Sequence, residues 1–148
     1  MMSIQRIRLV LLLVALSHGL SGQDEIIHSI FLIGDAGEPK ENPVLTLLKS
    51  EVDQVEHPAT VVFLGDNIYP KGLPPVGHPL RQEAEKAIDG QIESVQSFKG
   101  HKIFIPGNHD WAQGGKEGLD WLGLQEQYVE AAFDSADVWL PSRGCPGP

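Results

Sequence analysis

Three short motifs hold the side chains that could do chemistry, and each follows an apolar run of the sequence. They are Gly34-Asp35-Ala36-Gly37, Gly65-Asp66-Asn67-Ile68-Tyr69 and Gly107-Asn108-His109-Asp110. Carboxylate, phenol and amide oxygens, together with an imidazole, form a donor set that suits hard or borderline metal ions. The three motifs therefore predict a metal site.

The apolar runs before the motifs predict the elements that position these side chains. They indicate buried parallel strands over residues 27–33, 61–64 and 102–106, because short apolar runs closed by glycine are typical of such strands. Ligands of open α/β sheets bind beyond the carboxyl ends of the strands. We therefore expect the polar side chains of the motifs to share one rim of the sheet: Asp35, Asp66, Tyr69, Asn108 and His109.

Helices are predicted between and after the strands. The first has Asn42 as its N-cap and Pro43 at its first position, followed by an apolar face. The second is expected over Pro79–Phe98 and the third near Leu122–Phe133, from apolar residues at helical spacing. Strands that alternate with helices predict an α/β fold of βαβ units with a mostly parallel sheet.

At these residues the chain resembles the calcineurin-like metallophosphoesterases, and within them the purple acid phosphatase branch. Many members of the family open with Asp-x-His, whose histidine binds the first metal, but Gly37 stands at the matching position here. The purple acid phosphatase pattern has the same gap and fills it with the tyrosine of Gly-Asp-Asn-x-Tyr, which is Tyr69 in this chain. The last motif fits the shared family motif at every position.

The resemblance implies a centre of two metal ions, Fe(III) and a divalent Fe, Zn or Mn ion. Asp66 would bridge the two ions, and Asp35 and Tyr69 would complete the protein ligands of the first site. A phenolate ligand favours a hard trivalent ion, and this pairing gives the family's proteins their purple colour. Asn108 would offer its amide oxygen to the divalent ion.

For catalysis, the resemblance implies hydrolysis of a small-molecule phosphoester by a metal-bound hydroxide. His109 would contact the phosphate and help to protonate the departing alkoxide, and Asp110 would orient the imidazole ring. Imidazole suits this task because its unperturbed pKa of about 6.5 lets it hold or release a proton near neutrality. The expected activity is that of an acid phosphatase. A phosphodiesterase or nucleotide hydrolase of the same superfamily is the alternative enzyme.

The resemblance covers residues 26–148 and implies the amino-terminal half of a four-layer α/β/β/α sandwich. The family completes its site with a later histidine and a Gly-His-x-His motif, and no histidine follows His109 here. We therefore expect residues 23–148 to form the amino-terminal part of the domain, with an open strand edge and exposed apolar surface. A non-catalytic fragment that lacks the later histidine ligands is the alternative from another class.

The first 22 residues predict a secretory signal peptide. Arg6 and Arg8 precede an uninterrupted apolar run from Leu9 to Leu16, and small residues follow it. Such a segment is too short to span a bilayer and is removed on maturation. We expect a secreted or periplasmic protein that is not membrane-bound after cleavage. In an exported chain the single cysteine, Cys145, indicates an intermolecular bond, a free thiol or a missing partner.

The charge of the chain limits its partners. Without the leader, 9 basic and 20 acidic residues remain, which gives a formal net charge of −11. Such a surface argues against nucleic acid and anionic membranes as partners. It also repels anionic substrates at long range, so a phosphate must be attracted by local cations such as bound metal ions.

Overall fold

The structure is a computed structural model that describes residues 25–38 and 42–142. The predicted signal peptide and Cys145 lie outside the described residues. Within the described ranges, no helix is both long and apolar enough to cross a membrane.

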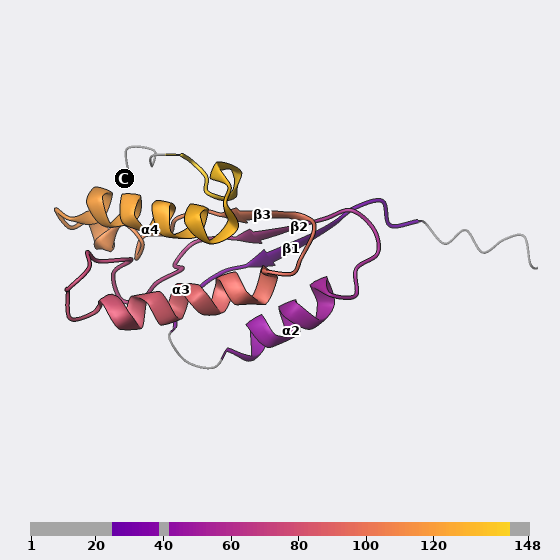
Figure 1. Ribbon diagram of the computed structural model, residues 1–148, viewed down its shortest axis with the longest axis horizontal. Helices are drawn as coiled ribbons and strands as arrows, with labels where there is room; N and C mark the ends of the chain where they lie inside the picture. Colours follow the sequence, from indigo (N-terminus) through magenta and orange to yellow (C-terminus); the bar gives the residue numbers. More distant parts are fainter. Residues whose placement is uncertain (1–24, 39–41, 143–148) are drawn as a thin grey trace, which may run out of the picture.

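Three parallel strands form one sheet, and helices alternate with them along the chain (Figure 1). The strands lie side by side in sequence order, as β1 (Ser29–Ile33), β2 (Ala59–Phe63) and β3 (His101–Phe104). The helices are α2 (Pro43–Val52), α3 (Arg81–Val95) and α4 (Gly118–Phe133), with short 3-10 helices η1 (Ala112–Gly114) and η2 (Ala136–Val138). The predicted α/β fold with a parallel sheet is confirmed.

The helix signals in the sequence correspond to specific contacts. The side chain of Asn42 accepts a hydrogen bond of 3.0 Å from the backbone N–H of Val44, and Pro43 begins α2, as predicted. Helix α4 begins at Gly118, four residues before the predicted start. Gly118 is buried against the carbonyl group of Trp111, where a side chain would clash. The first residue of α4 therefore lies in close contact with the backbone of Trp111.

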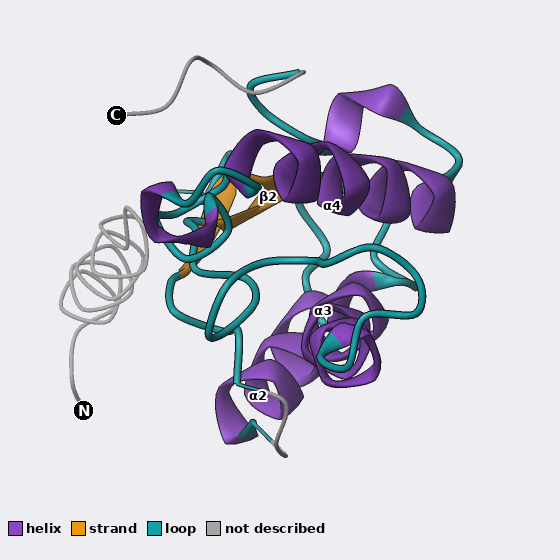
Figure 2. Ribbon diagram, turned by 90° about the vertical axis from the view of Figure 1, so that its left-hand side faces the viewer, coloured by secondary structure: helices purple, strands orange, loops and turns teal. Residues whose placement is uncertain are grey.

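The helices cover one face of the sheet and form the core with it. Helices α2, α3 and α4 all lie on the same side of the strands (Figure 2). On this side Val61 and Phe63 of β2 are fully buried, and the ring of Phe63 stacks on that of Phe104 with 4.4 Å between centroids. Phe104 in turn contacts Phe133 at the end of α4, so the third helix is tied to the same core.

The opposite face of the sheet is apolar and uncovered within the described part of the chain. Side chains of successive strand residues point to opposite faces. Those facing away from the helices form the open face, which includes Thr60 and the apolar residues Ile30, Leu32, Val62, Leu64 and Ile103. Leu32 is 59% exposed and Ile30 is 63% exposed, although both lie in a strand. The predicted exposed apolar surface is confirmed.

The two faces of the sheet should respond differently to the same kind of substitution. Leu32→Thr should change the free energy of unfolding by less than about 0.5 kcal/mol, because the side chain already meets water. It should also reduce the fluorescence of an apolar dye bound to the open face. Urea unfolding and dye titration measure both quantities.

Val61→Thr is the matched control on the buried face. It places a hydroxyl in the core and should cost about 1–3 kcal/mol. Equal destabilisation by Leu32→Thr and Val61→Thr would show that the open face is covered in solution.

Candidate metal centre

The three motifs meet at the edge of the sheet where the strands end. Asp35 follows β1, Asp66 follows β2, and residues 108–110 follow β3. The loops after β1 and β2 are joined by backbone hydrogen bonds, from the Asp35 N–H to the carbonyl of Gly65 (3.2 Å) and from the Tyr69 N–H to that of Gly37 (3.0 Å). The parallel pairing of the strands therefore gathers residues that are distant in sequence.

Asp35, Asp66 and Tyr69 form a group that we term the oxygen cluster. The phenol of Tyr69 donates a hydrogen bond of 2.8 Å to Oδ1 of Asp35 and lies 3.3 Å from Oδ2 of Asp66. Asp35 is exposed, while Asp66 and Tyr69 are half-buried. Two carboxylates and a phenol thus converge at a point that solvent can reach.

Both carboxylates of the cluster sit on unusual backbone. Asp35 has φ 55° and Asp66 has φ 52°, in the left-handed region that residues other than glycine seldom adopt. Aspartate tolerates this region better than most residues, and such conformations cluster at functional sites. The same rare conformation at the ends of two adjacent strands favours a role for both side chains in a site.

The electrostatics of the oxygen cluster keep the phenol protonated. Burial raises the pKa of Tyr69 far above its ordinary value, and the hydrogen bond to Asp35 and the negative charge of Asp66 raise it further. The phenolic proton lies between two acceptors that a cation would also bind. A metal ion that takes Tyr69 as a phenolate ligand must displace this proton.

The spacing of the cluster fits a small, hard metal ion. Adjacent ligands of an octahedral ion, each at about 2.0–2.1 Å from it, lie about 2.9 Å apart, and the phenol lies at 2.8 and 3.3 Å from the two carboxylate oxygens. Among the described residues, no three His, Cys, Asp or Glu side chains form a metal-binding group. A metal ion held by Asp35 and Asp66 would therefore need the phenol of Tyr69 as its third donor.

Asn108, the expected ligand of the divalent ion, is not drawn into the oxygen cluster. Its side chain is exposed, and its amide makes no hydrogen bond to the rest of residues 25–38 and 42–142. The backbone next to it is engaged, since the N–H of His109 donates a hydrogen bond of 3.0 Å to Oδ1 of Asp66. Of the four predicted metal ligands, the structure brings three into direct contact.

The His109 ring packs against the cluster and is held by a backbone group. Its ring meets that of Tyr69 edge-on, with 4.4 Å between centroids. Its Nδ1 lies 2.7 Å from the carbonyl oxygen of Pro70. A carbonyl can only accept, so Nδ1 carries the hydrogen, and Nε2 is the atom left to take up or release a proton.

The prediction that Asp110 orients this ring is wrong, because Asp110 points into the core. Its carboxylate is fully buried and accepts hydrogen bonds from the backbone N–H groups of Asn67, Ile68 and Gly107, at 2.8–3.1 Å. Burial raises the pKa of Asp110, while these hydrogen bonds act in the opposite direction. Asp110 holds the second and third motifs together, and the carbonyl of Pro70 has the role expected of it.

Two glutamines beneath the motifs were not foreseen from the sequence. Gln125 of α4 donates a hydrogen bond of 3.0 Å to Asp110, and Gln91 of α3 donates one of 2.7 Å to the carbonyl of Asn67. Both glutamines are fully buried. Each occupies the apolar stripe of its helix, and a polar residue in such a stripe is the signal that could have revealed them.

The structure explains why residue 37 is a glycine. A side chain at Gly37 would place its Cβ 2.5 Å from the carbonyl oxygen of Asp66 and 2.7 Å from the amide nitrogen of Ile68. The backbone of the second motif therefore occupies the space of any side chain at residue 37. Tyr69 belongs to that same motif, so the close approach that excludes a side chain also brings the phenol to Asp35.

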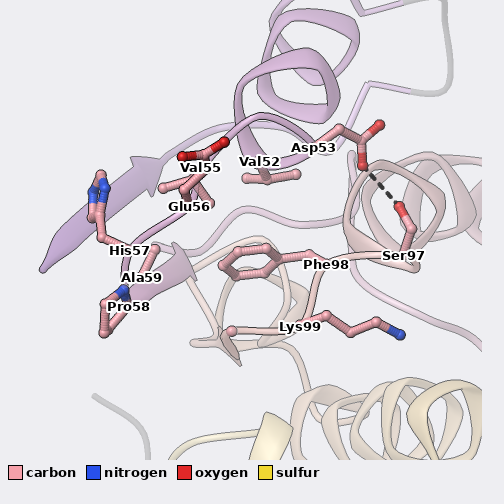
Figure 3. Close-up of a pocket in the computed structure, with 11 residues that line it drawn as sticks. Val52, Asp53, Val55, Glu56, His57, Pro58, Ala59, Ser97, Phe98 and Lys99 are labelled. Carbon is pink, nitrogen blue, oxygen red and sulfur yellow. Dashed lines mark hydrogen bonds between the residues drawn. The ribbon is translucent and has the colours of Figure 1, made fainter.

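A separate hollow of about 390 Å³ lies at the opposite edge of the sheet (Figure 3). It is lined by the segments that precede β2 and β3. Its polar contacts join α2 to the end of α3, since Asp53 accepts hydrogen bonds from Ser97 (3.0 Å) and Lys49 (3.1 Å). These contacts have a structural role, and none of the predicted site residues lines this hollow.

Comparisons with known proteins add no relative. No family model, no curated protein and no solved structure matches the chain.

Substitution of Gly37 tests the close approach that builds the cluster. Gly37→Ala should lower the free energy of unfolding by about 1–3 kcal/mol, because the added methyl group forces the loops after β1 and β2 apart. It should also weaken metal binding, since Asp35 and Tyr69 separate with the loops. Urea unfolding and calorimetric titration with Mn²⁺ measure the two effects.

Gly123→Ala is the matched control, because a Cβ there meets nothing within 4 Å. In the interior of α4 this change should raise stability by about 0.5–1 kcal/mol and leave metal affinity unchanged. If Gly37→Ala behaved like Gly123→Ala, the proposed steric reason for the glycine would be refuted.

Proposed function

We propose that this chain provides ligands of the metal centre of a phosphoric-ester hydrolase, of the type that the calcineurin-like and purple acid phosphatases represent. The observation that carries the proposal is the contact of Tyr69 with both Asp35 and Asp66, at 2.8 and 3.3 Å. This contact brings together the motif after β1 and the motif after β2 as a set of possible metal ligands. The set lies at the edge of the sheet where ligands of parallel sheets bind.

In this proposal the oxygen cluster would hold the first metal ion, and Asp66 would also serve as a ligand of the second. Oδ2 of Asp66 faces Tyr69, while its Oδ1 faces the loop after β3 through the N–H of His109. The two oxygens of this carboxylate are thus directed to the two parts of the site. Asn108 follows β3, and its amide has no hydrogen-bond partner in the part of the chain that the structure describes. Its oxygen would thus be available to the divalent ion.

Bound metal ions would neutralise charge on the phosphate and lower the pKa of the attacking water. The residues of the chain hold and orient the reacting groups. His109 directs Nδ1–H at the carbonyl of Pro70, so Nε2 is the ring atom that would give a proton to the leaving oxygen of the ester. Asp110 keeps the loop of His109 fixed against the loop of Asp66 by its buried hydrogen bonds.

The proposal extends to the fold. In the four-layer α/β/β/α sandwich implied by the resemblance, the open face of this sheet packs on a second sheet. The supporting observation is that the face is apolar along β1, with Ile30 and Leu32 63% and 59% exposed. Sheets that pack face to face bury such surfaces about 10 Å apart.

Asp66→Asn tests the proposed centre. The full chain should bind Mn²⁺, and the variant should bind it at least tenfold more weakly, because an amide replaces the carboxylate that serves both metal positions. Mn²⁺ bound to the chain should also broaden the ³¹P resonance of inorganic phosphate, and Asp66→Asn should abolish this broadening. Calorimetry and ³¹P NMR give the two readouts.

Asp120→Asn is the control, since Asp120 is an exposed carboxylate of α4. It should leave both readouts unchanged. Unaltered Mn²⁺ affinity in Asp66→Asn would refute the metal centre. Mn²⁺ binding without any effect on the phosphate resonance would leave a metal site but contradict its role with phosphoesters.

A further inference from the structure

A hollow of about 600 Å³ opens beside the candidate metal centre, at the turn between β3 and α4. Two of its lining residues also lie at the candidate metal centre. Asn108 is the expected ligand of the divalent ion, and the side-chain amide of Gln113 lies 3.3 Å from Nδ1 of His109. A molecule in the hollow would therefore lie next to the group that binds phosphate in the proposed function.

Part of the wall of the hollow is apolar, and the hollow leaves room for a flat group. Trp111 and Leu119 line it, and Leu119 is 59% exposed although it is a large apolar residue. Glycines at 114, 115 and 118 contribute no side chains, and a Cβ at Gly114 would meet nothing within 4 Å. A hollow of this size with an aromatic wall suits a small aromatic molecule.

The charge of the lining is opposite to that of the chain. The sequence has 20 acidic residues and a net charge of −9, yet no carboxylate lines the hollow, and Lys116 is its one charged residue. Lys116 is exposed and makes no ion pair within residues 25–38 and 42–142, whereas nearby Lys71 lies 3.9 Å from Glu117. An uncompensated cation beside an aromatic wall favours an aromatic anion.

We propose that this hollow binds the organic part of the substrate and selects aryl phosphate monoesters, with the ring against Trp111 and Leu119 and the negative charge near Lys116. The inference rests on the proposed function for its substrate class. The contacts to the ring and to Lys116 do not depend on a metal ion, so they can be measured without one.

The test is an NMR titration of the full, metal-free chain with 1-naphthyl phosphate, observed at the tryptophan indole N–H resonances. The chain has three tryptophans, and Trp139 is fully buried. The resonance of Trp111 should shift in a saturable manner, while that of Trp139 should not move. Inorganic phosphate should bind at least tenfold more weakly, because it lacks the ring.

Two lysine variants make the test specific. Lys116→Gln should weaken binding of 1-naphthyl phosphate at least threefold, and Lys86→Gln, an exposed position on α3, should not. Because Lys116 is exposed, its substitution should leave the fold intact. No saturable shift of Trp111, equal binding by Lys116→Gln and the native chain, or equal binding of inorganic phosphate would each overturn the inference.

The outcomes separate this inference from the proposed function. Naphthyl phosphate binding at Trp111 together with unaltered Mn²⁺ affinity in Asp66→Asn would support the hollow and refute the metal centre. Weakened Mn²⁺ affinity in Asp66→Asn without naphthyl phosphate binding at Trp111 would support the metal centre and refute the aryl preference.

Discussion

The buried carboxylate of Asp110 is the interaction on which the arrangement of the candidate site depends. It accepts hydrogen bonds from backbone N–H groups of two loops. Asn67 and Ile68 belong to the loop after β2, and Gly107 belongs to the loop after β3. Removal of these acceptors would leave several buried donors unpaired, which is costly in a core. The fixed relation of the two loops places the backbone of His109 against Asp66. Gln125 adds a further donor from α4, so the core of the fold supports the site directly.

Close packing of the backbone at glycines also holds the three motifs together. Gly37 lies against the loop that carries Asp66, and Gly65 with φ 105° lies against Gly107, where added side chains would clash with backbone. The three motifs are therefore packed at glycine contacts rather than spread along the edge. This packing brings the phenol of Tyr69 to within hydrogen-bond distance of two carboxylates. The absence of a side chain at residue 37 and the presence of the phenol thus have one structural origin.

Much of this arrangement could be predicted from the sequence, and the reasons for the failures are physical. Strand runs and the cap at Asn42 are local signals, and the fold follows them. Parallel pairing then requires the residues after the strands to share an edge. The role of Asp110 could not be predicted, because in a tight turn the direction of a side chain depends on the backbone around it. The sequence places Asp110 beside His109, while the fold directs it to donors 42 and 43 residues earlier in the chain.

The most direct test of the metal centre uses the fact that the chain has only two tyrosines. Tyr69 lies in the oxygen cluster, whereas Tyr128 donates a hydrogen bond of 2.8 Å to Asp89 and lies outside it. The measurement is the visible absorption spectrum of the full chain titrated with Fe(III). A phenolate-to-iron charge-transfer band should appear, should be lost in Tyr69→Phe and should remain in Tyr128→Phe. A band that persists in Tyr69→Phe, or no band in the native chain, would contradict the proposed centre.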